Sequence, residues 1–312
     1  MINRALLRIK IIQIIYSYYK SEGNSIPAAV KELFKSIEKT YQLYYHLMGL
    51  SVEITRYAAL KIDGKKHKMR PTEEDLHPNT RFVDNAFIKQ LSENEQLNSL
   101  LQENKLSWAD RQDIVKKLYE TIIEANFYKE YMEAPAVDYT ADKDIWRKIY
   151  KKIILEDEEL YESIEEQSIY WTDDLEIIIS FIIKTIKRFD EKKGARQELL
   201  PMFKDEEDEE FTEKLLTSAL ANGKMYREMI DGHTKNWEID RIAFMDIVIM
   251  EAALAEIMSF PTIPVSVTLN EYIEISKSYS TDRSAVFING VLDNIVKDLK
   301  AQNKLIKVVK IG

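Results

Sequence analysis

The sequence contains no cysteine and very few residues that interrupt helices. Its 312 residues include 8 glycines and 7 prolines. The lack of cysteine excludes disulfides, thiolate catalysis and cysteine-ligated zinc or iron–sulfur sites, and it is typical of a reducing compartment. With glycine so sparse, neither a GxGxxG nor a GxxxxGK[ST] loop is present, which excludes Rossmann and P-loop nucleotide binding. So few helix breakers predict a protein built mainly of long helices.

Histidine clusters and long apolar runs are also missing. The four histidines are scattered and show no HExxH spacing, so we expect no metal site and no cofactor. The densest apolar run, residues 177–183, is far shorter than the roughly 18 residues that a membrane span needs. The basic and apolar N-terminus has no small-residue cleavage site. We therefore expect a cytoplasmic protein.

The residues that are present predict an all-α globular chain. The composition is 45% hydrophobic and 31% charged, with a formal net charge of −9. Apolar residues recur at helical spacing in residues 2–20, after Pro27, and over 36–62. A polar basic loop is expected from Asp63 to Pro78, followed by further helices over 82–133. We expect N-terminal helices over 1–60, a middle helical block over 61–205, C-terminal helices over 206–300, and a basic, frayed tail over 301–312.

The C-terminal block has clear helix boundaries. Helices are expected over 211–234, from Asp240 to Met258, over 267–279 and over 284–299, and the acidic run 205–210 is expected to be a solvated linker. Gly290 lies inside the last helix, which predicts a close crossing with a neighbouring helix.

An internal repeat emerges when the chain is compared with itself at a shift of 66 residues. Trp171 then coincides with Trp237, Asp174 with Asp240, and apolar positions of two helices coincide as well: Ile145 with Phe211, Ile149 with Leu215, Leu160 with Tyr226, and Ile164 with Ile230. The alternative is a chance match, because any two amphipathic helices share this spacing.

The acidic clusters do not predict an enzyme. Residues 156–159 and 205–210 are contiguous acids, which occupy all sides of a helix or loop and are normally hydrated. Paired catalytic carboxylates need apolar surroundings that raise one pKa, and these runs provide none.

Cations gather at the start of the chain despite the overall negative charge. Arg4, Arg8, Lys10 and Lys20 precede the first acid, Glu22. Arg4 and Arg8 are one helical turn apart and form a fork pair at a helix N-terminus, where positive charge opposes the helix dipole. This unfavourable placement predicts an external anion.

An aromatic residue lies on the same helix as these cations. Gln13, Tyr16 and Lys20 share one arc, which combines an amide, a ring and an ammonium. Single-stranded RNA suits that combination because its bases stack on rings while its phosphates meet cations. The alternative is a core tyrosine beside a solvated lysine.

Two other parts of the chain also contain an aromatic or basic group that could contact RNA. Phe287 lies off the core stripe of the last helix, near Arg283, so it either stacks a base or sits at the core edge. Five basic residues follow the third helix (Lys61, Lys65, Lys66, Lys68 and Arg70), and there a flexible solvated loop is the simpler interpretation.

Several segments together resemble the NusB family of transcription antitermination factors. They are Trp237–Ile242, Met245–Asp246 through Glu256–Ile257, Ile263–Lys277 and Ser284–Asp293, and, in the first helix, Ile11–Tyr18. The pairing of the Asn270–Glu271 helix with Phe287-Ile-Asn-Gly-Val-Leu-Asp293 is the most specific part.

The resemblance implies a NusB-like helical bundle with an additional helical insert. It also implies noncatalytic binding of the boxA element of ribosomal RNA leaders together with NusE, a small-subunit ribosomal protein, in a complex that keeps RNA polymerase elongating. By position, the implied RNA contacts are Arg4, Arg8, Gln13, Tyr16 and Phe287, and Asp246 is implied to face the partner. The alternative is a helical protein–protein adaptor that does not bind RNA directly.

Overall fold

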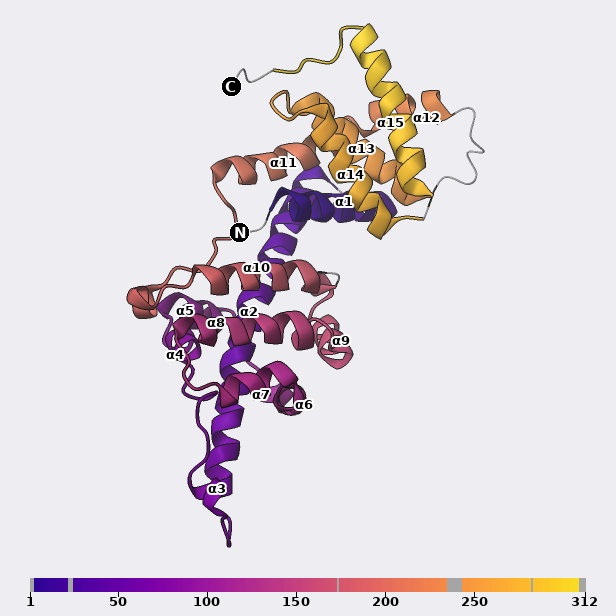
Figure 1. The fold of residues 1–312 in the computed structure, drawn as a ribbon. Coiled ribbons are helices and arrows are strands. Elements are labelled where there is room, and N and C mark those ends of the chain that lie inside the picture. Colours follow the sequence, from indigo (N-terminus) through magenta and orange to yellow (C-terminus); the bar gives the residue numbers. More distant parts are fainter. Residues whose placement is uncertain (1–2, 22–24, 173, 235–242, 282, 309–312) are drawn as a thin grey trace. The chain divides into compact units, whose positions relative to one another are not determined.

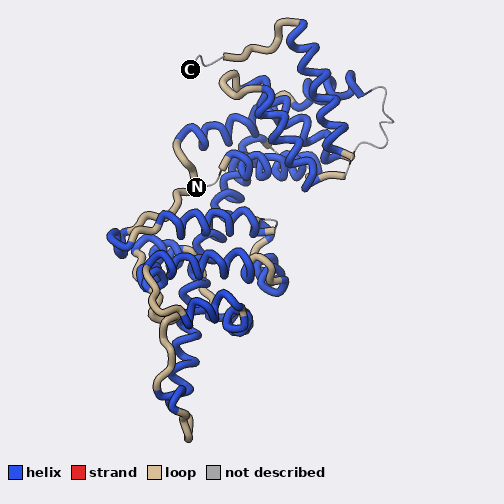
Figure 2. The backbone as a smooth tube through the Cα atoms, in the orientation of Figure 1, coloured by secondary structure: helices blue, strands red, loops and turns tan. Residues whose placement is uncertain are grey.

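The computed structural model describes residues 3–21, 25–172, 174–234, 243–281 and 283–308. Over these ranges the regular structure is helical and contains no strand, as Figure 2 shows. The predicted all-α fold is confirmed. No helix among the described residues is both long and apolar enough to cross a membrane.

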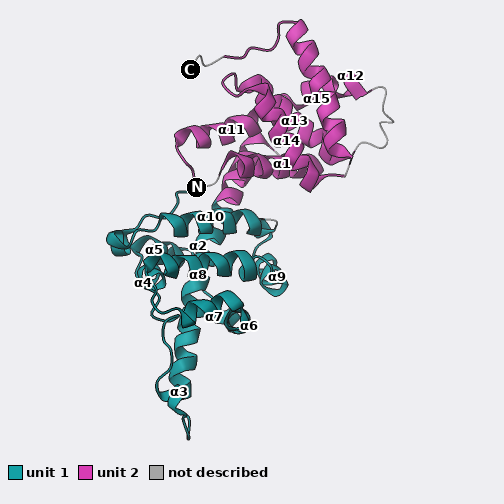
Figure 3. Cartoon of the chain, viewed as in Figure 1, with its two compact units in different colours: residues 1, 38–202 teal, residues 2–37, 203–312 magenta. Residues whose placement is uncertain are grey.

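The chain forms two compact units, coloured separately in Figure 3. Unit 1 contains residues 38–202 together with residue 1, and unit 2 contains residues 2–37 and 203–312. One long helix, α2 (Ile26–Lys66), contributes its first turns to unit 2 and the rest to unit 1. The first division between the two units therefore falls at residue 37, inside this helix.

Unit 2 is organised around a helix that is buried on nearly every side. This helix, α13 (Phe244–Ser259), is buried from Val248 to Ile257, as expected for an apolar helix inside a core. The helices that pack against it are α1 (Arg4–Lys20), α11 (Glu206–Ala221), α12 (Gly223–Thr234), α14 (Val265–Tyr279) and α15 (Ser284–Ala301). Figure 1 shows α13 among these helices.

Unit 1 surrounds the remainder of α2 with shorter helices. They are α3 (Glu73–Leu76), α4 (Ala86–Ser92), α5 (Glu95–Glu103), α6 (Gln112–Glu124), α7 (Asn126–Glu133), α8 (Tyr139–Ile149), α9 (Glu158–Gln167) and α10 (Leu175–Arg188), with single turns at Ala109–Arg111, Tyr150–Ile154, Ile169–Trp171 and Glu191–Arg196. Buried hydrogen bonds attach them to α2, and most involve neutral groups, although the Asp174 carboxyl accepts from Thr40 at 2.6 Å. The Tyr44 hydroxyl lies 2.6 Å from that of Thr185, and the Tyr150 hydroxyl donates to the Leu47 carbonyl at 2.7 Å.

The structure changes several predicted boundaries. The two helices expected around Pro27 and 36–62 are one helix, since Pro27 lies in its first turn, where a missing N–H costs nothing. The acidic run 205–210 is not a linker: Asp205 caps α11, and the acids that follow occupy its first turn, where they complement the helix dipole. The helix expected over 211–234 breaks at Asn222 into α11 and α12.

Two further expectations about the C-terminal block were wrong. A Cβ on Gly290 would meet nothing within 4 Å, so Gly290 marks no helix crossing. The basic tail is attached and not frayed at its described end, because Val308 N–H donates to the Pro261 carbonyl and Lys307 donates to the carbonyls of Phe260 and Ile263.

The predicted repeat has a counterpart in the order of the helices. In unit 1, α8, α9 and α10 follow one another at nearly the positions that α11, α12 and α13 take after the shift of 66. The four pairs of apolar positions that coincide at this shift are all buried. Trp237 and Asp240 lie outside the described residues, so the repeat stays a prediction.

Candidate nucleic-acid interface

Helix α1 carries most of the predicted site and is held firmly in unit 2. Asn3 caps it by accepting a hydrogen bond from the backbone N–H of Leu6. Its apolar side chains are buried against α11 and α13. The backbone of α1 is therefore fixed within unit 2, and each predicted contact can be located on it.

Arg4 is paired with the protein's own acids. Its Nε donates to Asp208 Oδ1 at 2.7 Å, and its guanidinium lies 4.9 Å from the centre of the Phe211 ring. Asp208 belongs to the acidic first turn of α11. The anion that the basic N-terminus predicts is thus supplied internally, and about a third of the Arg4 side chain remains exposed.

Arg8 lies in the interior. The residue is 3% exposed, and it donates from Nε and Nη2 to the two oxygens of Glu256 at 2.7 and 2.8 Å. Nη1 donates to Glu271 at 3.1 Å. Burial alone would lower the pKa of Arg8, but the hydrogen bond and charge of Glu256 outweigh it and raise the pKa.

Two of the cations that were predicted on the surface of α1, Arg8 and Lys10, are buried instead. The expected fork of Arg4 and Arg8 does not face solvent, because Arg8 is used in the core. Lys10 is likewise only 2% exposed. The sequence pattern identified the cations but contained no sign of their partners, which lie about 200 residues or more away in the chain.

The aromatic part of the site is on the surface. Tyr16 is half-buried and packs edge-on against Phe244, with ring centres 5.4 Å apart. The exposed Lys20 places its ammonium 4.5 Å from the Phe244 ring centre and 5.7 Å from that of Tyr16. Gln13, one turn earlier, is also half-buried. An amide, two rings and an ammonium therefore do lie together.

A cluster of charged side chains lies next to these rings. The Tyr19 hydroxyl donates to Glu251, and Arg227 Nε donates to the other oxygen of that carboxylate at 2.9 Å. The Arg227 guanidinium lies 3.6 Å from the centre of the Tyr19 ring. Burial raises the pKa of Glu251, against the opposing effect of its two donors.

Asp246 lies in the same first turn of α13 as Phe244, and it is buried. Its carboxylate accepts from the Ser280 hydroxyl, which in turn accepts from Ser284 at 3.0 Å. These bonds fix the start of α15, where Arg283 is exposed and Phe287 is 9% exposed. Phe287 is therefore a core-edge residue, and Arg283 is the accessible one of the two.

The structure gathers only part of the predicted site. Gln13, Tyr16 and Lys20 of α1 and Phe244 of α13 lie together, and Arg283 is linked to the same turn of α13 through Ser284, Ser280 and Asp246; we call these five residues the aromatic–cationic surface. Arg4 lies twelve residues before Tyr16, which is about 18 Å along the helix. Sequence reasoning missed Phe244, since it opens an almost continuously apolar helix and carries no signal of exposure.

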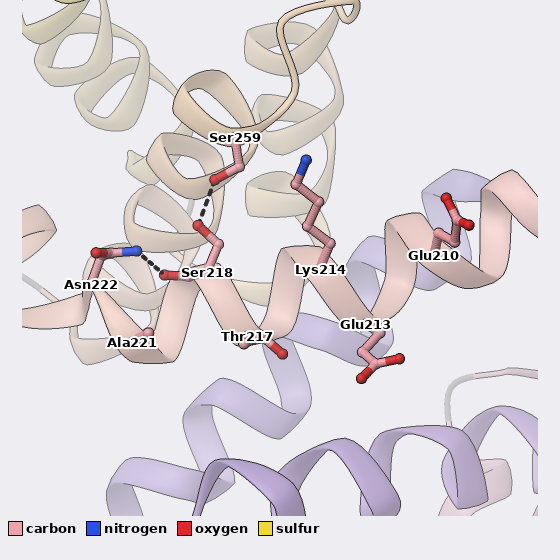
Figure 4. Close-up of a pocket in the computed structure, with 8 residues that line it drawn as sticks. All are labelled: Glu210, Glu213, Lys214, Thr217, Ser218, Ala221, Asn222 and Ser259. Carbon is pink, nitrogen blue, oxygen red and sulfur yellow. Dashed lines mark hydrogen bonds between the residues drawn. The ribbon is translucent and has the colours of Figure 1, made fainter.

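An open pocket of about 630 Å³ lies elsewhere in unit 2, along the outer face of α11 (Figure 4). At one end of the pocket, Asn222 donates to the Ser218 carbonyl, and the Ser218 and Ser259 hydroxyls lie 2.5 Å apart. The lining brings together no nucleophile with a base. Among the described residues, no group of three acids or histidines is placed to hold a metal ion.

Comparisons with known proteins give a consistent result. Residues 174–297 match the NusB family. A transcription antitermination protein NusB from Salinibacter ruber is 36% identical over 132 residues, which cover 40% of this chain and 82% of the relative. One from Bacillus licheniformis is 41% identical over 95 residues, covering 30% and 74%.

A solved structure of T. maritima NusB is 26% identical and covers 46% of this chain and 89% of that one, with a TM-score of 0.30. The family segment Trp237–Ile242 lies outside the described residues. Given the extent and identity of the match to the curated relatives, the chain belongs to the NusB family.

Proposed function

We propose that this chain binds boxA-type leader RNA together with NusE and joins the RNA polymerase elongation complex to support processive transcription of ribosomal RNA operons. Its role is noncatalytic. The observation that carries the RNA part is the cluster of Tyr16, Lys20 and Phe244 at the start of α13. Rings beside an exposed ammonium suit an unpaired strand, whose bases stack while its phosphates are neutralised.

The residues of the surface take different parts in this proposal. Tyr16 offers its exposed edge to a base, Gln13 offers an amide to a base edge, and Lys20 and Arg283 meet phosphates. Arg8 and Lys10 act from the interior by holding α1 in place. Arg4 is available to RNA only through the exposed part of a side chain that already pairs with Asp208.

The partner side of the proposal involves Asp246. Because its carboxylate holds Ser280 and through it Ser284, Asp246 fixes the loop that presents Arg283. A NusE contact near this loop would depend on Asp246 even though the carboxylate is buried. Replacing Asp246 would then weaken the binding of NusE and of RNA together.

The test measures fluorescence anisotropy of a labelled boxA-type RNA oligomer with and without NusE. We expect Lys20→Gln/Arg283→Gln and Tyr16→Ala each to weaken binding tenfold or more. The log–log salt slope should fall by about 0.7 for each phosphate that the double variant no longer neutralises. The matched control is Lys31→Gln/Lys224→Gln, which removes two exposed cations of unit 2 outside this surface.

Two outcomes would overturn the proposal. One is RNA affinity that is unchanged in both variants and insensitive to salt. The other is tight NusE binding with no RNA binding at all, which would instead establish a protein-only adaptor. Pairing of Arg4 and Arg8 with internal carboxylates is the observation that favours this second function.

A further inference from the structure

Unit 1 concentrates positive charge on α8, α10 and the segment after α10. Residues 143–152 contain five lysines and arginines and one acid, and residues 184–196 contain six and two. The whole chain has a net charge of −9. This local excess is therefore opposite in sign to the protein as a whole.

The two helices lie side by side over the same part of α2. Tyr150, which follows α8, bonds to Leu47, and Thr185 of α10 bonds to Tyr44. Lys143 joins the helices by donating to the carbonyl of Phe189 at the end of α10, at 2.9 Å. At 100° per residue, Lys148 and Lys187 point away from the sides that face α2.

The exposed cations here have no acidic partners. Within the described residues, no carboxylate lies within ion-pair distance of the members of this group, which are Lys148, Lys151, Lys184, Lys187, Arg188, Lys192 and Lys193. We call this group the α8–α10 surface. It contrasts with Arg4 and Arg8 of unit 2, whose guanidinium groups pair with the protein's own carboxylates. Unpaired like charges repel, so a bound polyanion would relieve the repulsion.

The chemistry of the surface distinguishes between polyanions. Membrane-surface binding uses apolar side chains placed among the cations. The large exposed hydrophobic residues of the described chain include Leu60, Met69, Ile169 and Val286, and none lies in α8, α10 or residues 189–196. The aromatic side chain at the start of α8, Tyr139, is half-buried and already has the Lys143 ammonium 5.2 Å from its ring centre. A nucleic-acid backbone requires neither exposed apolar side chains nor a free ring, because phosphates alone bind it.

We propose that the α8–α10 surface binds the phosphate backbone of RNA without regard to sequence. This binding is separate from that of the aromatic–cationic surface and belongs to the other unit. This inference rests on the proposed function in one respect, which is that the nucleic acid is RNA. Unit 1 would then hold RNA flanking the boxA-type element, so the insert adds affinity for longer transcripts.

The experiment uses the full chain and three labelled RNAs: a boxA-type 12-mer, a 30-mer of unrelated sequence, and the 12-mer joined to that 30-mer. The variant Lys148→Gln/Lys151→Gln/Lys184→Gln/Lys187→Gln removes four unpaired cations. The control, Lys65→Gln/Lys66→Gln/Lys116→Gln/Lys129→Gln, removes four exposed lysines of the same unit that lie elsewhere. Circular dichroism confirms that both variants are folded.

We expect the variant to bind the unrelated 30-mer and the joined RNA about tenfold or more weakly, with the salt slope reduced by roughly 0.7 for each phosphate that is no longer neutralised. Its affinity for the 12-mer should be unchanged, and the control should resemble the unmodified protein. Unchanged affinity for both longer RNAs would overturn the inference. So would binding to phosphatidylserine vesicles that depends on these lysines without any binding of the 30-mer.

The outcome is separable from that of the proposed function. If the 12-mer is not bound but the unrelated 30-mer binds in a lysine-dependent way, the boxA proposal fails and this inference stands. If the 12-mer binds and the 30-mer contributes nothing, the reverse holds.

Discussion

The two units hold their interiors together by different chemistry. In unit 2, Arg8 and Glu256 form a buried ion pair that also receives hydrogen bonds from Thr268 and Tyr272. In unit 1, the buried hydrogen bonds of α2 join it to neutral groups, such as the Thr185 and Tyr150 hydroxyls, and to the carboxyl group of Asp174, which accepts from Thr40 at 2.6 Å. Unit 2 thus buries a cation together with its carboxylate partner, whereas no ion pair among the described residues of unit 1 has both side chains buried.

This difference determines how each unit responds to substitution and to pH. A buried ion pair is costly to break from one side, because the remaining charge loses its compensation. An interior without a buried ion pair lacks this vulnerability, but it becomes pH-sensitive through a buried imidazole. In unit 1 that group is His46, which is fully buried and stacks on Trp108 with ring centres 4.3 Å apart.

The largest effect is expected from Arg8→Met. It leaves Glu256 buried without its cation, so we expect the free energy of unfolding to fall by about 3–5 kcal/mol. Urea titration followed by far-UV circular dichroism measures the loss. The double variant Arg8→Met/Glu256→Met should recover part of it.

The control for this prediction is Arg4→Met on the same helix. The Arg4 pair is partly exposed and is screened by solvent, so its removal should cost less than about 1 kcal/mol. A similar loss for both arginines would show that burial of the pair does not set its contribution, and the contrast between the units would fail.

The second effect is a pH dependence carried by unit 1. Burial lowers the pKa of His46 to about 4, from an ordinary value near 6.5. Between these values the unfolded chain binds a proton that the folded chain excludes, so the contribution is complete above pH 6.5 and is lost as the pH falls toward 4. The difference corresponds to about 3 kcal/mol.

Replacing His46 with phenylalanine tests this dependence. The slope of unfolding free energy against pH between 6.5 and 4 should be smaller in His46→Phe than in the unmodified protein. Urea titrations at several pH values, followed by tryptophan fluorescence, measure it, because three of the four tryptophans lie in unit 1. His77→Gln, at an exposed position, should leave the slope unchanged. An unaltered slope in His46→Phe would assign the dependence to other groups.

Sequence reasoning succeeded where the determinant is local and failed where it is a distant partner. Helical periodicity predicted the all-α fold, and the arc of Gln13, Tyr16 and Lys20 was correctly placed on one helix. The burial of Arg8 could not be predicted, because Glu256 and Glu271 lie about 250 residues away and resemble other acids of the chain. The α8–α10 surface was missed since its cations come from two segments separated by some thirty residues, each diluted by acids nearby in sequence.

The smallest effects concern two glycines of unit 2. A Cβ on Gly223 would overlap the Tyr19 hydroxyl and lie 2.9 Å from Glu251, so Gly223→Ala must displace the Tyr19–Glu251 hydrogen bond. We expect it to lower the free energy of unfolding by about 1–3 kcal/mol despite the better helix propensity of alanine. Gly290→Ala meets open space and should raise it by about 0.5–1 kcal/mol. Thermal unfolding of the two variants, measured in parallel, tests both expectations. Changes of opposite sign in the free energy of unfolding would show that close approach to the buried charged cluster, and not helix propensity, requires glycine at position 223. A gain in stability at both positions would show that this cluster tolerates movement. The cluster would then constrain unit 2 less than its buried charges imply.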